Sequence, residues 1–340
     1  MTSTPTRQKP LNVAEFGAGV RAGDRAMLGR AITLVESTRD ADRRLAGELL
    51  ESLLPHCGRS HRIGITGVPG VGKSTLIDQF GMNLITAGKR VAVLAIDPTS
   101  SLTGGSILGD KTRMARLSQH GNAFIRPSPT QGTLGGVTRR TRETMALVEA
   151  AGFDVVIVET VGVGQSETAV ADMVDVFVVL LLAGGGDDLQ GIKKGIIELA
   201  DIIAINKSDG DNLARATRAA GEYQSALNIL MPRSAAWTPP VVTISGLANS
   251  GLERLWDAIQ KHRSVLTATG EHQARREQQS VRWMHALLDD AMQALLRSNS
   301  GTAARLPAVE ANVRSGGMTP QRAVAELMAL LADAASGAKP

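Results

Sequence analysis

The sequence is short of several features that define whole classes of protein. Its 340 residues include a single cysteine, Cys57, which excludes a disulfide framework and leads us to expect a reducing, cytoplasmic setting. Aromatic residues make up only 3% of the chain, so an aromatic platform for stacking nucleic-acid bases is not expected. The longest apolar run, Val176 to Gly186, is about half as long as a membrane-spanning helix must be. We therefore expect neither a nucleic acid nor a membrane as partner.

The chain also lacks a large excess of positive or negative charge. The chain has 37 Lys and Arg against 33 Asp and Glu, a formal net charge of +4, which is too small an excess to indicate a polyanionic partner. Hydrophobic residues at 43% and charged residues at 21% are ordinary values for a globular chain and exclude bulk disorder. The length fits roughly two domains, or one large α/β domain with appendages.

Short β-branched runs, separated by helix-length segments, fill the middle of the chain. Such runs are typical of strands buried on both faces of a parallel sheet. The pattern predicts a doubly wound α/β domain over residues 57–265. The seven runs are Ile63–Thr66, Val91–Asp97, Ala123–Arg126, Val155–Glu159, Val176–Leu182, Ile202–Asn206 and Val241–Ser245.

Helical patterns flank this domain on both sides. Residues 1–56 read as a polar tail followed by a helical extension, with one apolar face formed by Leu45, Leu49, Leu50, Leu53 and Leu54. In residues 266–340 the spacing of Val281, Met284, Leu288, Ala291 and Leu295 predicts a helix–helix seam. A second helix is expected from Thr319 as N-cap and Pro320, carrying Val324, Leu327, Leu330 and Leu331. These helices either pack back on their own sheet or form a dimerisation arm, and we favour a homodimer.

The strongest motif is Gly67-Val-Pro-Gly-Val-Gly-Lys-Ser74, which lies between a predicted strand and a predicted helix. This is the P-loop of nucleoside triphosphatases. Its glycines let successive backbone N–H groups face a phosphate at a helix N-terminus. Lys73 is expected to reach the β- and γ-phosphates, and Ser74 to complete a Mg²⁺ shell. The loop residues Gly70, Val71, Gly72 and the following Thr75 complete the expected phosphate site.

A second motif, Asn206-Lys-Ser-Asp209, follows a later predicted strand and points to guanine. The Asp209 carboxylate can accept from both N1–H and the exocyclic amine of guanine, a donor pair that adenine lacks. Asn206 is expected to hold the base edge and the loop, and the Lys207 stem to cover the base face. Further on, Ser245-Gly246-Leu247 lies where a backbone N–H can meet guanine O6. The alternative for the motif is an ordinary Asn/Asp turn.

Glu159-Thr-Val-Gly162 ends another predicted strand. We expect Glu159 to hold a Mg²⁺-bound water and the Gly162 N–H to bond the γ-phosphate, which would couple nucleotide state to the next loop. In that loop Gln165 is the candidate for orienting the attacking water. The alternative for Glu159 is a strand-end acid that caps a helix.

Two further polar stretches follow predicted strands. Residues 97–114 read as a switch that carries Asp97 and Asp110 near the metal, or else as a solvated loop. Residues 184–194 read as a second switch with Asp187, Gln190 and Lys193 as contacts, or else as a plain connector. Three arginines, Arg139, Arg140 and Arg142, are candidates for a catalytic arginine, although arginine clusters more often form a solvated face.

A metal-delivery function has to be weighed as well, because His56, Cys57 and His61 lie close together before the first predicted strand. Their spacing matches no standard zinc pattern. We expect no metal site at this cluster.

Taken together, the stretches GVPGVGKST, IDPTSSLTGGSILGDKTRM, RPSPTQGTLGGV, VIVETVGVGQSE, GDDLQGIKKGI and NKSDGDN resemble the MeaB/ArgK family of GTPases associated with methylmalonyl-CoA mutase. The resemblance covers residues 15–295. It implies a P-loop GTPase domain with helical extensions at both ends and a homodimer formed through the C-terminal arm. It also implies a chaperone that uses GTP to gate loading of adenosylcobalamin onto an acyl-CoA mutase, which itself holds that cofactor.

Carried onto this chain, the resemblance implies that Asp97, Asp110 and Glu159 surround the Mg²⁺ ion and that Lys73, Asp110, Glu159 and Gln165 take part in hydrolysis. The loop with Asp187, Asp188, Gln190, Lys193 and Lys194 is implied as a switch through which the mutase accelerates hydrolysis. The sequence departs mildly from the family, with Asp188 in place of the usual glutamate and Ser208 in place of the usual alanine. Other possible functions are a metal-insertion GTPase, an ATP-using transport-linked kinase and a module that only senses GTP.

Overall fold

The computed structural model describes residues 12–96, 114–127, 134–160, 166–183, 194–228 and 234–337. The chain divides into two compact units, Met1–Glu277 and Gln278–Pro340. Unit 1 contains the sheet and every motif named above; unit 2 is helical.

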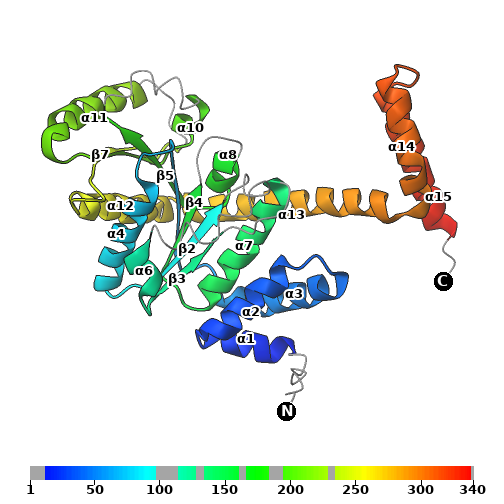
Figure 1. Cartoon of the computed structure of the whole chain (residues 1–340), viewed down its shortest axis with the longest axis horizontal. Helices are drawn as coiled ribbons and strands as arrows, with labels where there is room; N and C mark the ends of the chain where they lie inside the picture. Colours follow the sequence, from blue (N-terminus) through cyan, green and yellow to red (C-terminus); the bar gives the residue numbers. More distant parts are fainter. Residues whose placement is uncertain are drawn as a thin grey trace, which may run out of the picture. The chain divides into compact units, whose positions relative to one another are not determined.

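A seven-stranded sheet in the order β3-β2-β4-β1-β5-β6-β7 forms the centre of unit 1 (Figure 1). Every neighbouring pair is parallel, and each strand overlaps one of the seven predicted runs, with ends that differ by one or more residues in some strands. The predicted doubly wound fold is therefore confirmed, with all of the carboxyl ends at one edge. The strands are β1 (His61–Gly67), β2 (Val91–Ile96), β3 (Ala123–Arg126), β4 (Val155–Thr160), β5 (Val176–Leu182), β6 (Ile202–Asn206) and β7 (Val241–Thr243).

Helices cover both faces of this sheet. Alternate residues of each strand point to opposite sides, so Val178 and Leu180 belong to one hydrophobic cluster and Phe177 and Val179 to the other. The first cluster includes side chains from α4 (Lys73–Thr86), α6 (Ala115–Gln119) and α12 (Leu252–Ala268). The second includes side chains from α7 (Leu134–Ala150), α8 (Ser166–Ala171), α10 (Lys194–Glu198) and α11 (Leu213–Leu227).

The predicted N-terminal extension consists of α1 (Val13–Arg21), α2 (Arg25–Glu36) and α3 (Asp40–Leu53), which pack against one another and against α7. Asn12 and Glu15 form a capping box on α1, which stabilises the first turn because two orphan N–H groups gain acceptors. Leu49 and Leu53 are fully buried as expected. Leu54 is 64% exposed; its predicted burial is wrong because a 3₁₀ turn, Leu54–His56, ends the α-helical spacing there.

Buried ion pairs lie at the amino ends of the strands. Arg62 in β1 bonds Glu149 through two N–H groups, at 2.8 and 2.7 Å. Asp175 precedes β5 and accepts from Arg276 at 2.8 and 2.7 Å, while Asp201 precedes β6 and accepts from Arg275 at 3.0 and 3.1 Å. Both arginines belong to the first turns of α13 (Glu271–Ser298). We call Asp175, Asp201, Arg275 and Arg276 the amino-edge clamp.

Electrostatics explains why the clamp carboxylates stay ionised. Burial alone would raise the pKa of Asp175, but the hydrogen bonds from Arg276, the neighbouring His272 and the positive charges of Arg276 and Arg62 hold that pKa well below its usual range. The pKa of Asp201 is likewise lowered, because His262 and Arg275 outweigh its desolvation. Removing one partner would leave the other charge buried and uncompensated.

Unit 2 consists of the remainder of α13, α14 (Ser300–Arg314) and α15 (Pro320–Gly337). The helix α15 begins at Pro320 as predicted, and the Thr319 hydroxyl accepts from the Arg322 N–H at 3.3 Å. α14 was not expected; its apolar residues do not line up on one face, and it contains Pro307. An apolar stripe on α13 is exposed, formed by Val281, Met284, Leu288, Met292 and Leu295.

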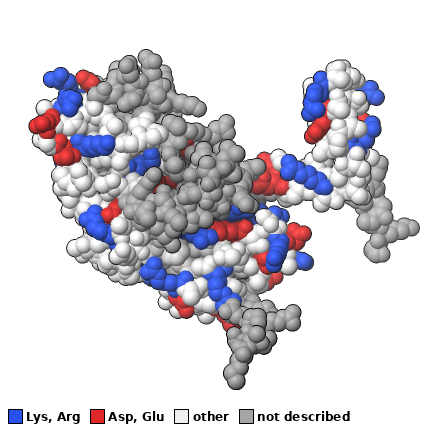
Figure 2. All heavy atoms as spheres, viewed as in Figure 1, with Lys and Arg blue, Asp and Glu red and all other residues white. Residues whose placement is uncertain are grey.

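Acidic and basic side chains are interspersed on the face of each unit that Figure 2 shows, as the nearly balanced charge leads one to expect. Within the described part of the chain, no helix has the length and apolar character that crossing a bilayer requires.

Candidate functional site

The P-loop connects β1 to α4 at the carboxyl edge of the sheet. Its backbone must turn sharply, and Gly72 adopts φ +93°, a conformation that side-chain-bearing residues rarely take. A Cβ at this position would also lie 2.9 Å from Asn206 Nδ2. Glycine is therefore required at position 72 both by the turn and by the close approach of β6.

Lys73 is buried at the start of α4, where its ammonium donates to the carbonyls of Gly67 at 2.7 Å and Val68 at 3.3 Å. Desolvation lowers the pKa of Lys73, while the carboxylates of Glu159 and Glu167 oppose that shift. The P-loop thus holds a cation next to the phosphate-binding backbone, balanced by two acidic groups from β4 and α8.

Ser74 and Glu159, both predicted to lie around the metal, are in direct contact in the structure. The Ser74 hydroxyl donates to Glu159 Oε1 at 3.2 Å, and the Glu159 side chain is buried. A hydroxyl and a carboxylate are oxygen donors, which is the donor type that Mg²⁺ prefers. These two residues therefore fit a Mg²⁺ ion, while the other two predicted ligands, Asp97 and Asp110, lie outside the described residues.

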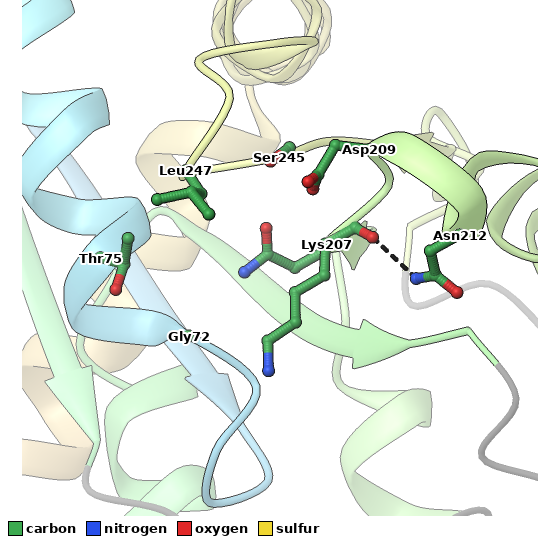
Figure 3. Close-up of a pocket in the computed structure, with 8 residues that line it drawn as sticks. Gly72, Thr75, Lys207, Asp209, Asn212, Ser245 and Leu247 are labelled. Atoms are coloured by element: carbon green, nitrogen blue, oxygen red, sulfur yellow. Dashed lines mark hydrogen bonds between the residues drawn. The ribbon is translucent and has the colours of Figure 1, made fainter.

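A cavity of about 390 Å³ opens beside the P-loop, a volume within the range of small-molecule sites. Figure 3 shows the side chains of Thr75, Leu247, Lys207 and Asp209 around the same space. The residues predicted to bind guanine thus meet at one site although they come from separate loops. The cavity is lined by Gly72, Thr75, Asn206, Lys207, Asp209, Asn212, Ser245 and Leu247.

Asn206 connects the two loops on either side of this cavity. Its amide donates to Val71 O at 2.8 Å and its Oδ1 accepts from the Gly246 N–H at 3.2 Å. Gly246 packs so closely that a Cβ there would lie 2.7 Å from Leu76 Cα. The P-loop and the Ser245–Leu247 loop are therefore held in register by one buried side chain.

Comparisons with known proteins agree with this geometry. A model of the methylmalonyl Co-A mutase-associated GTPase MeaB matches residues 28–301. The chain belongs to the MeaB family.

Its relatives extend over most of the chain. GTPase ArgK of Escherichia coli (strain K12) is 54% identical over 272 residues, covering 80% of this chain and 82% of the relative. The mouse protein named methylmalonic aciduria type A homolog, mitochondrial, is 48% identical over 315 residues, covering 90% and 76%. A crystal structure of a protein named LAO/AO transport system kinase is similar with a TM-score of 0.75 and 41% identity, covering 95% and 99%. As a member of this GTPase family, the chain binds GTP and GDP and hydrolyses GTP.

Several predicted site residues of this MeaB-family chain lie outside the described residues. They are Asp97, Asp110, Gly162, Gln165, Asp187, Asp188, Gln190 and Lys193. Lys194 begins α10, but its side chain is not described.

The candidate catalytic arginines Arg139 and Arg142 make hydrogen bonds within unit 1. Arg139 donates to Glu143 at 2.9 Å along the same helix, and Arg142 donates to the Asp172 carbonyl at 2.8 Å. Both contacts fit a structural role for these side chains.

Sequence reasoning missed two residues of the site. Glu167 is a buried carboxylate that acts on the pKa of Lys73, and Asn212 lines the cavity. Both stand inside family-like stretches, VIVETVGVGQSE and NKSDGDN. The sequence signal for Glu167 was an acidic residue shortly after the predicted strand that ends at Glu159. The signal for Asn212 was a further polar residue after the guanine motif.

The His56, Cys57 and His61 cluster has other contacts. Cys57 Sγ donates to the carbonyls of Leu53 and Ala146, both at 3.3 Å, and burial raises the pKa of the thiol to about 11. The His61 ring packs on Trp256 with centroids 5.1 Å apart. A protonated thiol is a poor metal ligand, and no group of three or more His, Cys, Asp or Glu within the described ranges could hold a metal ion.

Proposed function

We propose that this chain is a Mg²⁺-dependent GTPase that acts as a chaperone for an adenosylcobalamin-dependent acyl-CoA mutase, with methylmalonyl-CoA mutase as the first partner to test. GTP hydrolysis would gate the loading and protection of a cofactor that the mutase, not this chain, holds. The observation that carries the proposal is the joint presence of a P-loop, a cavity built from the guanine motif, and a family match named for the mutase.

The proposed nucleotide site follows from these contacts. The backbone of Gly70, Val71, Gly72, Ser74 and Thr75 would hold the phosphates at the start of α4. Asp209 would accept from guanine N1–H and its exocyclic amine, and the Lys207 stem would cover the base face. A backbone N–H of the Ser245–Leu247 loop would donate to guanine O6.

In the proposed reaction water attacks the γ-phosphate in line with the leaving oxygen. The Lys73 ammonium stabilises negative charge on the β- and γ-phosphate oxygens. Ser74, Asp97, Asp110 and Glu159 would hold Mg²⁺, and a bound Mg²⁺ supplies further neutralisation of that charge. Gln165 orients the water, and the Gly162 N–H bonds the γ-phosphate.

The partner would act through the loop that follows β5. Asp187, Asp188, Gln190, Lys193 and Lys194 are proposed to contact the mutase and to change the rate of hydrolysis. Because β5 also borders the P-loop strand β1, this loop starts next to the phosphate site. A cytoplasmic setting is part of the proposal.

The test measures GTP hydrolysis by the pure protein with and without apo methylmalonyl-CoA mutase. We expect a clear mutase-dependent increase, loss of hydrolysis on chelation of Mg²⁺ with EDTA, and loss of GTP turnover in Asp209→Asn with recovery on xanthosine triphosphate. The last result follows because xanthine presents a carbonyl where guanine presents an amine. If GTP binds but no mutase-dependent increase occurs, this partner is wrong.

The homodimer is proposed to form through the exposed α13 stripe of unit 2. Its residues follow three- and four-residue steps, and five exposed apolar side chains on one helix are typical of a helix–helix seam. Leu288→Glu should convert the dimer to a monomer in analytical ultracentrifugation. Glu310→Gln on α14, outside the stripe, is the control, and a monomeric parent protein would overturn this part of the proposal.

A further inference from the structure

Lys207, which lines the cavity, has an unusual backbone conformation. Among the described residues that are not glycine, only Lys207 and Asn249 have positive φ, at 58° and 51°. Asparagine tolerates the left-handed region because its short polar side chain can bond locally, whereas lysine has no such compensation. The conformation of Lys207 therefore requires support from neighbouring groups.

Asn212 supplies such support. Its Nδ2 donates to the Lys207 carbonyl at 2.7 Å, the contact drawn as a dashed line in Figure 3. Asn212 also lines the cavity. The hydrogen bond closes a turn from Lys207 to Asn212 that contains Asp209, the residue proposed to bind guanine.

The position of Asn212 makes this contact informative. It is the N-cap residue of α11, where asparagine is among the most favourable residues because its side chain can accept from the helix N–H groups. Here its side chain makes no capping hydrogen bond. Stabilising α11 therefore does not account for the side chain, whereas the bond to Lys207 does.

The rest of the turn is fixed independently. The Ser208 N–H donates to the Ile244 carbonyl at 3.0 Å and its hydroxyl donates to the Ile205 carbonyl at 2.7 Å. Those bonds secure residue 208 to β6 and to the end of β7, but neither acts on the Lys207 carbonyl. Among the described residues, the Asn212 amide is the group that donates to the Lys207 carbonyl.

We infer that Asn212 is a positioning residue for guanine recognition. It holds Lys207 in the left-handed conformation so that the Lys207 stem and the Asp209 carboxylate contact the same base. This inference rests on the proposed function, because it assigns the cavity to the base of GTP. Asn212 acts on the nucleotide through Lys207 and leaves the phosphate site unaffected.

The first test is Asn212→Ala. Losing one hydrogen bond of ordinary strength should weaken GTP and GDP binding about three- to tenfold and raise KM for GTP, with kcat at saturating GTP changed less than about twofold. Competition by inorganic tripolyphosphate, which reports on the P-loop alone, should be unchanged. Asn228→Ala is the matched control, since Asn228 is exposed at the other end of α11.

A second measurement separates positioning from a general loss of structure. Glycine adopts positive φ without strain. In a Lys207→Gly background the hydrogen bond from Asn212 therefore has less backbone strain to offset at position 207. Asn212→Ala should then weaken GTP binding by less than about twofold further. An equal penalty in both backgrounds would overturn the inference.

Parallel titration of Asp209→Asn distinguishes the two levels of the argument. If Asp209→Asn leaves GTP affinity unchanged, the cavity is not the base site and the proposed function fails with it. If Asp209→Asn weakens GTP binding but Asn212→Ala behaves like Asn228→Ala, the positioning role alone is wrong. Loss of tripolyphosphate binding in Asn212→Ala would also reject it, because the effect would not be confined to the base.

Discussion

The two edges of the sheet treat buried charge in opposite ways. At the amino edge, Arg62, Asp175 and Asp201 each lie within hydrogen-bond distance of an oppositely charged side chain. At the carboxyl edge, the buried Lys73 ammonium donates to two backbone carbonyls, and its pKa is lowered by desolvation. The charges of the amino edge are hydrogen-bonded to one another, whereas the Lys73 cation has backbone carbonyls as its hydrogen-bond partners and the carboxylates of Glu159 and Glu167 nearby.

This difference separates stability from function along the same strands. A charge paired inside the protein is not available to a ligand, and removing its partner is destabilising because the remaining charge is buried and uncompensated. A cation held by neutral carbonyls can exchange those contacts for phosphate oxygens, which are stronger partners. Substitutions at the amino edge should therefore act on unfolding, and those at the carboxyl edge on hydrolysis.

The largest effect is expected at the amino-edge clamp. Asp175→Asn keeps the shape of the side chain but leaves Arg276 buried without its counter-charge, which should reduce the free energy of unfolding by about 3–5 kcal/mol. Urea denaturation measures the change, with the exposed Asp257→Asn as control. If the variant is as stable as the parent but defective in GTP binding, the proposed division between the edges is wrong.

Lys73→Ala tests the carboxyl edge. Removing a preorganised charge from the phosphate site should slow GTP hydrolysis by about 10²–10³-fold, or roughly 3–4 kcal/mol of activation free energy. The urea midpoint should not fall, because the substitution also removes the free-energy cost of burying the Lys73 ammonium away from water. Lys261→Ala, at an exposed position of α12, should change neither quantity; a large drop in stability for Lys73→Ala would contradict the comparison.

A smaller effect should appear in the pH dependence of stability. Burial, with a contribution from nearby Arg263, lowers the pKa of His61 from 6.5 to about 4. As pH falls, the unfolded chain therefore binds a proton at His61 before the folded chain does. The contribution of neutral His61 to the free energy of unfolding is complete above pH 6.5 and is lost as pH falls toward 4. His61→Gln should flatten that slope in urea midpoints measured from pH 7.5 to 4.5, whereas the exposed His56→Gln should retain it.

The smallest effect is expected at Cys57, just before the amino edge. Serine can still donate to a carbonyl, so Cys57→Ser should lower the free energy of unfolding by less than about 1 kcal/mol and leave hydrolysis unchanged. Titration with Ni²⁺ or Zn²⁺, followed by calorimetry, should detect the same binding in parent and variant. A site that disappears with Cys57 would revive the metal-insertion function.

The sequence predicted the sheet well because its inner strands β2, β4 and β6 are buried on both faces and so form nearly continuous apolar runs. The ends were less well predicted: β1 begins at His61, whose polarity hides it, and β7 ends at Thr243 because Ser245 pairs with Ser250 in an isolated bridge. α14 lacked the apolar periodicity that would have revealed it. The local apolar pattern of a sequence thus indicates which residues are buried but not the residue at which strand pairing stops.

For the candidate site, motif spacing predicted Asn206, Lys207, Asp209, Ser245 and Leu247, and the structure brings them to one cavity. Asn212 and Glu167 escaped because their contacts depend on how loops fold back in three dimensions. A hydrogen bond from Asn212 to a carbonyl five residues earlier has no periodic signature. The roles assigned to individual site residues stay predictions.

The position of β1 in the sheet also has a consequence during synthesis. β1 leads into the P-loop and precedes the other six described strands in the chain, but its neighbours in the sheet are β4 and β5, which end at Thr160 and Leu182. At about 5–20 residues per second, the ribosome needs on the order of ten seconds to supply both partners. The strand that leads into the phosphate site is thus made well before both of its partners, so nascent chains should be most vulnerable to aggregation in that interval.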